Sequence, residues 1–219
     1  MEQGSDEWRD ARLGYFSSSE NWKLIGTGRK NTYTDVGLTY IKNKLGEKMS
    51  GIPVESQDSK ATIWGKTYEP MAREWYCKKF GMVVDEVGFM THPAIKNFGG
   101  SPDGLTYKVG SGDNAGILEI KCPEVYANHI NHLRIKSVEY FKDEFPQKYW
   151  QCVSNMVVCG LNYSDFVSFD PRMNSKMGMF VFRFELNKAD AGFLCDRIVM
   201  ASAELENIAK EIGFESSPS

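Results

Sequence analysis

Three charged side chains have the types and the spacing needed for metal-assisted hydrolysis. Asp103 stands at the head of one short strand-like run, and Glu119 and Lys121 lie in a second run, I-L-E-I-K at residues 117–121. Because side chains alternate along a strand, Glu119 and Lys121 share one face and the aliphatic residues take the other. A Gly/Ser/Asn/Asp-rich turn over residues 110–116 joins the two runs and predicts a β-hairpin. We therefore expect Asp103 to reach the face that carries Glu119 and Lys121.

Two carboxylates and one ammonium group around a single point suit chemistry on a phosphodiester. Hard anionic oxygens favour Mg²⁺ or Mn²⁺, and the backbone carbonyl of Ile120 could complete the shell. Lys121 could orient a water molecule or help to deprotonate it, while the metal stabilises the charge that develops. The alternative is a plain hairpin in which Glu119 and Lys121 form a surface ion pair, worth about 0–1 kcal/mol. The short P-D…E-x-K pattern alone leaves both interpretations open.

The composition predicts one well-packed domain. The chain has 219 residues, of which 42% are hydrophobic and 13% aromatic, enough for a core but too short for two full domains. Its net charge of −3 does not favour nucleic acid, so contact with DNA would depend on locally gathered basic residues. The five cysteines show no C-x-x-C spacing, and no signal peptide or membrane-length apolar run is visible. These features predict a cytoplasmic protein without a membrane partner, zinc ribbon or iron–sulfur cluster.

The elements that must position these residues alternate between helix and strand. Start signals and periodicity predict helices from Ser5, from the serines at 17–19, from Thr34 to about Lys48, and over about 60–80, 125–133, 143–159 and 187–212. Strands are expected within 82–90, after Gly100, and at 117–121, 163–169 and 179–186. Pro70 interrupts the helix over 60–80, so we expect a kink or two abutting helices there. The predicted fold is α/β, a central mixed β-sheet flanked by helices.

Several other side chains could carry function or only structure. Arg12 and the nearby hydroxyls at 17–19 could hold a phosphate, although caps are the commoner use of such serines. Glu69 lies at the proline break, where it could face an active site or solvent. His129 and His132, three residues apart, could bind zinc, but no third ligand accompanies them, which favours core or surface histidines.

The order of several short blocks resembles the phage lambda exonuclease and YqaJ-type viral recombinase family. The blocks are W-R-D-A-R-L-G…S-S-E, W-G-K-x-Y-E, S-P-D-G-L, L-E-I-K-C-P, Y-W-Q-C-V-S-N-M-V-V and F-D-P-R-M, between Trp8 and Met173. The resemblance implies a restriction-endonuclease-like core and a Mg²⁺-dependent enzyme that degrades the 5′-ended strand of duplex DNA to leave a 3′ overhang. It also implies a toroidal homotrimer, a single-strand annealing protein as partner, and a phage- or prophage-type protein of a bacterial cytoplasm.

The resemblance also implies roles for individual residues. Asp103, Glu119 and the Ile120 carbonyl would bind the metal, and Lys121 would position the attacking water. Glu69 would be an acid near the metals, and Gln151 would touch the active site. The 5′ phosphate would be bound by Arg12, Ser19 and Ser101. Arg29 aligns only loosely with a DNA-contacting position. An aspartate that the family carries ten residues before Asp103 is missing, because residues 91–94 read T-H-P-A. A second metal would therefore be held differently, for example with His92 or Glu69, or bound weakly.

Two alternative functions stay open. A restriction-like endonuclease could share the same core, or the chain could be a catalytically silent module that binds DNA ends. The presence of Asp103, Glu119 and Lys121 together disfavours the silent module. We expect a single nuclease domain over 1–219, with a helical N-terminal part at 1–60, a catalytic core at 61–212 and a flexible tail at 213–219.

Overall fold

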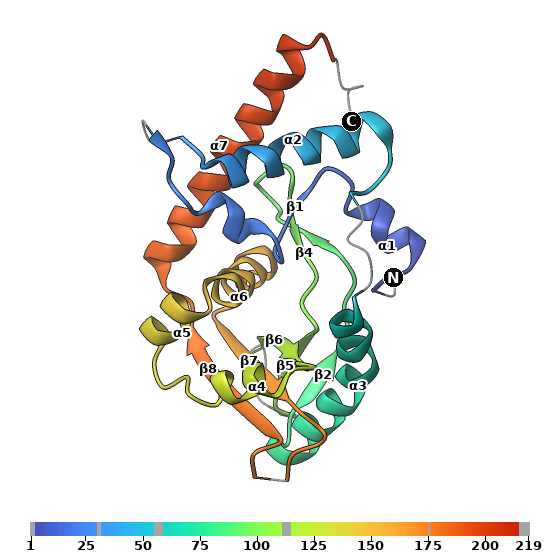
Figure 1. Cartoon of the computed structure of the whole chain (residues 1–219), viewed down its shortest axis with the longest axis vertical. Coiled ribbons are helices and arrows are strands. Elements are labelled where there is room, and N and C mark those ends of the chain that lie inside the picture. Colours follow the sequence, from blue (N-terminus) through green and yellow to red (C-terminus); the bar gives the residue numbers. More distant parts are fainter. Residues whose placement is uncertain (1–2, 30–31, 55–58, 111–114, 175, 215–219) are drawn as a thin grey trace.

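The computed structural model describes residues 3–29, 32–54, 59–110, 115–174 and 176–214. Runs of helices and runs of strands follow one another along the chain (Figure 1). The helical elements are α1 (Asp6–Ala11), the 3₁₀ turn η1 (Asn21–Leu24), α2 (Asp35–Ser50), α3 (Lys60–Phe80), α4 (Tyr126–His132), α5 (Val138–Glu144), α6 (Pro146–Cys159) and α7 (Lys188–Glu211). The strands are β1 (Phe16–Ser17), β2 (Val83–Asp85), β3 (Met90–Thr91), β4 (Phe98–Gly100), β5 (Gly104–Tyr107), β6 (Gly116–Lys121), β7 (Tyr163–Phe169) and β8 (Met179–Glu185).

A five-stranded mixed sheet positions the charged residues. Its strands follow the order β2-β5-β6-β7-β8, and all neighbours are antiparallel except β6 and β7, which are parallel. A parallel pair needs a crossover connection, which α4, α5 and α6 supply between β6 and β7. The predicted α/β fold, a mixed sheet flanked by helices, is therefore confirmed. β6, which carries Glu119 and Lys121, is the middle strand of this sheet.

β5 and β6 form the predicted hairpin. They are antiparallel neighbours, with Thr106 opposite Gly116. Gly116 accepts no side chain, because a Cβ there would lie 2.1 Å from a tyrosine ring of β7. Of the predicted turn over 110–116, positions 111–114 lie outside the described residues. Asp103 comes one residue before β5, so the hairpin brings it beside β6.

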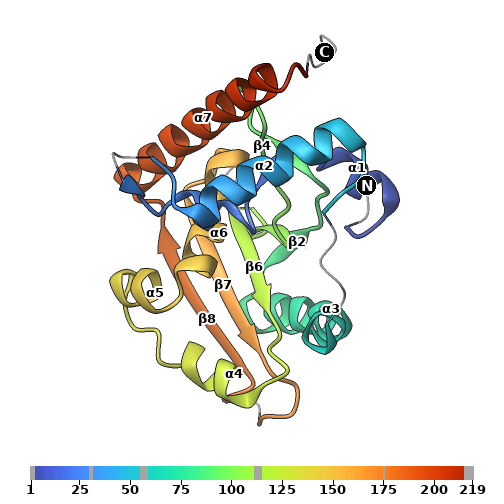
Figure 2. The same ribbon diagram turned by 45° about the horizontal axis from the view of Figure 1, so that its top comes forward.

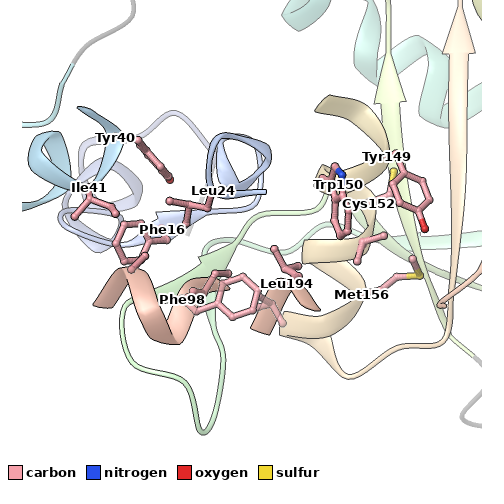
Figure 3. Close-up of a cluster of buried hydrophobic side chains, with 14 of the residues drawn as sticks. Phe16, Leu24, Tyr40, Ile41, Phe98, Tyr149, Trp150, Cys152, Met156 and Leu194 are labelled. Carbon is pink, nitrogen blue, oxygen red and sulfur yellow. The ribbon is translucent and has the colours of Figure 1, made fainter. Parts of the chain in front are cut away.

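Helices cover both faces of the sheet and form two hydrophobic cores. On one face, α6 packs against the sheet and α7 packs against α6, and the same core continues to α2, β1 and β4 (Figure 3). Figure 3 labels ten of its side chains: Phe16, Leu24, Tyr40, Ile41, Phe98, Tyr149, Trp150, Cys152, Met156 and Leu194. On the other face, Ala72 and Tyr76 of α3 join a core with Leu118 and Ile120. Because side chains alternate along β6, Glu119 is left on the face that α6 covers.

A second, three-stranded sheet was not anticipated from the sequence. Its strand order is β1-β4-β3. The prediction of a helix beginning at the serines 17–19 is wrong, because this stretch holds the end of strand β1 and then the short 3₁₀ turn η1. The backbone N–H of Ser18 donates to the Gly99 carbonyl of β4 at 3.0 Å, and that of Ser17 donates to the Tyr40 hydroxyl at 2.9 Å. These tertiary partners replace the hydrogen bonds of a helical first turn.

α3 confirms the predicted helix over 60–80 and decides between the two alternatives at Pro70. It runs as one helix of 21 residues through Pro70, so two abutting helices are excluded. Ser59 caps its start by accepting from the Thr62 N–H, and Gly81 ends it in the left-handed region at φ 62°. The face turned to the sheet carries the buried Ala72 and Tyr76, whereas large apolar residues on the remaining surface are exposed. Those exposed residues are Ile63, Met71, Trp75 and Phe80.

The C-terminal half follows the sequence-based expectations closely. The predicted helix over 143–159 corresponds to α6, which Pro146 starts at a position where proline cannot continue the preceding helix α5; α5 itself was not predicted. Asn187 caps α7 with its side-chain oxygen, as the expected start at 187 requires. Within the described ranges, no helix combines the length and apolarity needed to cross a membrane. Residues 215–219 of the predicted tail lie outside the described part.

Candidate active site

The middle strand β6 buries an ion pair beneath the surface. The Glu119 side chain is 0% exposed, and its Oε1 accepts a hydrogen bond of 2.5 Å from Lys121 Nζ. Lys121 lies at the end of the strand and keeps 30% of its side chain exposed. A surface ion pair, the structural alternative considered above, is therefore excluded. Burial of a carboxylate costs free energy unless hydrogen-bonded partners compensate it. The buried position of Glu119 therefore indicates a role other than a polar surface.

Asp103 docks directly onto the same strand. Its Oδ2 accepts from the backbone N–H of Ile120 at 2.6 Å, and its own N–H donates to the Leu118 carbonyl at 3.1 Å. The carboxyl group of Asp103 therefore lies between the positions of Glu119 and Lys121 along β6. The expectation that Asp103, Glu119 and Lys121 converge is met by the fold.

Glu69 of α3 reaches the group from the neighbouring helix. Its Oε1 forms an ion pair of 2.7 Å with Arg73, one helical turn further on. Arg73 also pairs with Glu86 at 2.9 Å and donates to the Asp103 carbonyl at 3.3 Å. Arg73 was not singled out from the sequence, although the spacing of four residues after Glu69 on a helix was a usable signal. It connects α3 to the segment that carries Asp103.

Burial and the charge of Asp103 perturb the neighbouring carboxyl groups. Burial and then the charge of Asp103 raise the pKa of Glu119 to about 8. The same two causes raise the pKa of Glu69 to about 7. Burial also raises the pKa of Asp103, although Lys121 and the Ile120 N–H act in the opposite direction. Carboxyl groups with raised pKa values that lie close together are a common property of functional sites.

Lys121 is a cation in this arrangement. Burial alone would lower the pKa of Lys121, but the nearby carboxylates of Glu119 and Asp103 raise it above its usual range. A protonated amine donates hydrogen bonds and cannot accept a proton. Of the two roles considered for Lys121, orientation of a water molecule is therefore favoured over its deprotonation.

The donor set fits a hard divalent cation. Glu119 on β6 and Asp103, which docks onto the neighbouring Ile120 N–H, offer carboxylate oxygens whose pKa values burial raises. Among the described residues, no three His, Cys, Asp or Glu side chains form a complete metal cluster. Mg²⁺ commonly uses only one or two carboxylates and keeps several waters, so this set suits Mg²⁺ better than a structural metal. Glu69 lies in the same electrostatic environment but is held by Arg73.

One cleft joins these acids to the predicted phosphate site. The cavity measures about 960 Å³ and is lined by Asp103 and Glu69 as well as by Arg12 and Ser19. In Figure 2, α1 and the end of α2 lie above α3 on the same side of the molecule, and these three helices border the cleft. The sequence places Arg12 and Asp103 far apart, so only the fold brings them into one cavity.

Arg12 is held in the cleft by stacking rather than by an acid. Its guanidinium lies 4.0 Å from the centre of the Trp8 ring, and Trp8 Nε1 donates to the Ser101 hydroxyl at 2.9 Å. No carboxylate within the described ranges forms an ion pair with Arg12. Burial lowers the pKa of Arg12, yet a guanidinium remains charged at neutral pH. Trp8, which the sequence reasoning did not assign, therefore connects Arg12 to Ser101.

The remaining predicted residues lie in different places. Gln151 is on α6, and no hydrogen bond among the described residues joins it to the acids; Asn155, one turn further along, donates to Glu119 Oε2 at 3.1 Å instead. His92 does not line the cleft, and its Nδ1 accepts from the backbone N–H groups of residues 94 and 95. Arg29 is exposed and contributes nothing to the cleft.

His129 and His132 are core residues, as favoured from the sequence. Their exposed fractions are 0% and 2%, and each Nδ1 lies 2.8 Å from the Ser168 hydroxyl. His129 Nε2 donates to the Met177 carbonyl at 2.7 Å. The pair fastens α4 to β7, and zinc binding finds no support.

Comparison with known proteins gives a family match and similar solved structures. Residues 7–162 match the family described as YqaJ-like viral recombinase domain. The alkaline exonuclease LHK-Exo from Laribacter hongkongensis, solved in complex with dAMP, is similar with 30% identity and a TM-score of 0.80 over 95% of this chain and 96% of that chain. A second structure of LHK-Exo gives 29% identity and a TM-score of 0.79 over the same shares.

A more distant structure shares only the fold. A phage-related exonuclease from Haemophilus somnus 129PT has 13% identity and a TM-score of 0.71, over 91% of this chain and 96% of that chain. Comparison with curated proteins gives no match.

Proposed function

Because this chain belongs to the YqaJ-like viral recombinase domain family, we propose that it is a Mg²⁺-dependent exonuclease that degrades double-stranded DNA from the 5′ end. It removes nucleotides in the 5′-to-3′ direction and leaves a 3′ single-stranded overhang for phage-type recombination. The likeness to LHK-Exo over 95% of the chain supports exonuclease activity. The direction and the metal are proposals that rest on the site.

The cleft that contains both Arg12 and Asp103 carries this proposal. Arg12 stacks on Trp8 and has no ion-pair partner in the described part of the chain, and together with Ser19 and Ser101 it suits a phosphate group. Asp103 and Glu69 line the other part of the same cleft, and Glu119 and Lys121 lie beside Asp103 on β6. Together these residues suit hydrolysis of a phosphodiester. An enzyme that holds a terminal phosphate next to its hydrolytic groups starts from ends, whereas an endonuclease has no need for a terminal-phosphate site.

The residues have separate tasks in the proposed reaction. Asp103, Glu119 and the Ile120 carbonyl would hold Mg²⁺, and Mn²⁺ is a plausible substitute. The bound ion would stabilise the negative charge that develops on the phosphate oxygens. Lys121, a cation hydrogen-bonded to Glu119, donates to the attacking water and orients it.

The acid Glu69 and the amide Gln151 also belong to the proposed site. Glu69 adds negative charge near Asp103, and Arg73 fixes its orientation. Gln151 is proposed to contact the substrate from α6. Arg12, Ser19 and Ser101 would bind the 5′ phosphate and so set which bond lies at the acids.

A digestion experiment tests the proposal. Linear duplex DNA with 5′ phosphates is incubated with the protein in Mg²⁺ or in EDTA, beside a closed circle of the same sequence. We expect mononucleotide release and 3′ overhangs from the linear DNA only with Mg²⁺, and an intact circle. Cutting of the circle would favour the restriction-like endonuclease. Binding to ends without any release would favour the silent end-binding module.

The proposal includes an assembly and a partner. The family resemblance implies a homotrimeric ring that encloses DNA, which would reconcile the net charge of −3 with DNA binding if basic residues line the channel. A single-strand annealing protein would then receive the 3′ overhang.

A further inference from the structure

Asn155 of α6 is buried against the candidate metal ligand Glu119. Both side chains are 0% exposed, and Asn155 Nδ2 donates to Glu119 Oε2 at 3.1 Å. Lys121 occupies the other oxygen, Oε1, at 2.5 Å. The two donors together fix the plane of the Glu119 carboxylate, because each addresses a different oxygen.

The other end of the Asn155 amide faces the strand that leads to Asp103. Asn155 Oδ1 is buried and accepts no hydrogen bond. A Cβ built on Gly100 would lie only 2.4 Å from this oxygen and 2.2 Å from the Ser18 hydroxyl, so only glycine fits there. Gly100 ends β4 and is followed by Ser101, and the chain reaches Asp103 two residues later. The amide thus fills the space between Glu119 and the segment 100–103.

Packing alone does not explain an asparagine at this position. An unpaired buried oxygen costs about 1–3 kcal/mol, and a leucine of similar shape would avoid that cost. Side chains around Asn155 on the same face of the helix, such as Cys152, are apolar and pack in the core. The hydrogen bond from the Asn155 amide to Glu119 therefore accounts for a polar side chain at this position.

We propose that Asn155 is a positioning residue that orients the Glu119 carboxylate for the divalent cation and keeps it in register with the segment carrying Ser101 and Asp103. This inference rests on the proposed function, since it assumes that Glu119 binds the metal. Outer hydrogen-bond partners of metal ligands fix the orientation of those ligands and tune their affinity. Asn155 touches neither DNA nor the reacting atoms in this assignment.

Binding of Mn²⁺ to the DNA-free protein tests the role directly. The Kd is measured by the electron paramagnetic resonance signal of free Mn²⁺ for the wild type, Asn155→Leu and Asn155→Ser. We expect roughly 10- to 100-fold weaker binding for Asn155→Leu, the range typical of lost outer partners. Asn155→Ser, which leaves room for a bridging water, should lose less and serves as the second variant if the leucine variant does not fold.

Ser154→Ala is the matched control. Ser154 lies next to Asn155 on α6, is also 0% exposed, and contacts Asn21 at 3.5 Å rather than Glu119. It should bind Mn²⁺ like the wild type. Binding of 5′-phosphorylated DNA ends without metal should be the same in all variants, because among the described residues Asn155 forms no hydrogen bond with Arg12, Ser19 or Ser101. A general structural defect would weaken this DNA binding as well.

Two results would overturn the inference. Unchanged Mn²⁺ affinity in both Asn155 variants would show that the amide does not act through Glu119. An equal loss in Ser154→Ala would assign the effect to packing of α6. If instead the wild type binds no Mn²⁺, the proposed metal site itself fails, so the two failures are distinguishable.

Discussion

The raised pKa values of Glu119 and Glu69 link metal binding to pH. The pKa values of about 8 for Glu119 and about 7 for Glu69 lie above the ordinary value of 4.5 expected in the unfolded chain. Between pH 4.5 and about 8, the native state therefore holds more protons on these two groups than the unfolded state does. The free energy of unfolding of the metal-free protein therefore falls, through these groups, as pH rises from about 4.5 to about 8.

Bound Mg²⁺ should restore the stability that the metal-free protein loses as pH rises. We expect excess Mg²⁺ to raise Tm more at about pH 8.5 than at about pH 6, because protons no longer compete for the carboxylates. Thermal unfolding followed by fluorescence, with and without Mg²⁺ at both pH values, measures the difference. In Glu119→Gln the increase in Tm caused by Mg²⁺ should be small at both pH values. Equal shifts for the wild type at the two pH values would contradict a proton-linked metal site.

Lys121→Ala should separate hydrolysis from binding. The variant loses the donor that orients the water, and we expect the rate of hydrolysis to fall about 100- to 1,000-fold while DNA-end affinity is retained. Single-turnover digestion and fluorescence anisotropy measure the two quantities. Lys78→Ala is a suitable control, since Lys78 forms an exposed pair with Glu74 on α3 at 2.5 Å. Unchanged hydrolysis in Lys121→Ala would reject the assigned role.

Arg12→Ala should affect one kind of DNA end. Loss of a charge-assisted hydrogen bond is expected to raise KM for 5′-phosphorylated ends roughly 10- to 100-fold, with little change for 5′-hydroxyl ends. Arg9→Ala is the control, because Arg9 lines the same cleft but pairs with the exposed Asp6 at 2.9 Å. An equal loss on both kinds of end would argue against a phosphate site at Arg12.

At the level of elements, two buried histidines attach α4 to the sheet. His129 Nε2 donates to the Met177 carbonyl, and the Nδ1 atoms of His129 and His132 both lie 2.8 Å from the Ser168 hydroxyl. α4 begins five residues after Lys121, so the attachment also holds the chain that leaves the active-site strand.

Acid should weaken this attachment. Burial, and then the charges of Lys148 and His129, lower the pKa of His132 to about 3 from 6.5. The unfolded chain therefore takes up a proton that the native state refuses, and stability through this group falls as pH drops from 6.5 toward 3. At about pH 5.5 the loss is about 1.4 kcal/mol relative to about pH 7.5.

Urea unfolding of the wild type and His132→Gln at these two pH values measures that loss. The variant should be less stable at the higher pH but should show a smaller decrease on acidification. The same decrease in both proteins would mean that His132 is not the group responsible.

At the level of the whole molecule, a ring would explain how an acidic chain handles DNA. We expect a mass close to three times the 24.8 kDa of one chain by light scattering after size-exclusion chromatography. The exposed apolar residues of α3, which include Ile63, Met71 and Trp75, are candidates for contact surfaces between copies. A monomer at micromolar concentration, active on DNA ends, would contradict the ring.

The secondary structure near the site was predictable because it depends on local signals. Alternation in I-L-E-I-K and the turn residues before it predicted the hairpin, and Thr34 and Asn187 predicted the starts of α2 and α7. The stretch after Ser17 was predicted wrongly because its backbone pairs with β4, which lies about 80 residues further along the chain. The unforeseen residues Trp8, Arg73 and Asn155 act through partners distant in sequence.

By itself, the sequence determined which chemistry is available: two carboxylates and an amine on neighbouring strand positions, and an arginine with hydroxyls near the N-terminus. Residue types and alternation along a strand are local properties, so they can be read without a fold. Tertiary structure alone decided that Arg12 and Asp103 share one cleft, that Glu119 is fully buried, and that Asn155 holds it. These depend on packing between distant elements, and the raised pKa values of the acids exist only once burial and mutual repulsion act together.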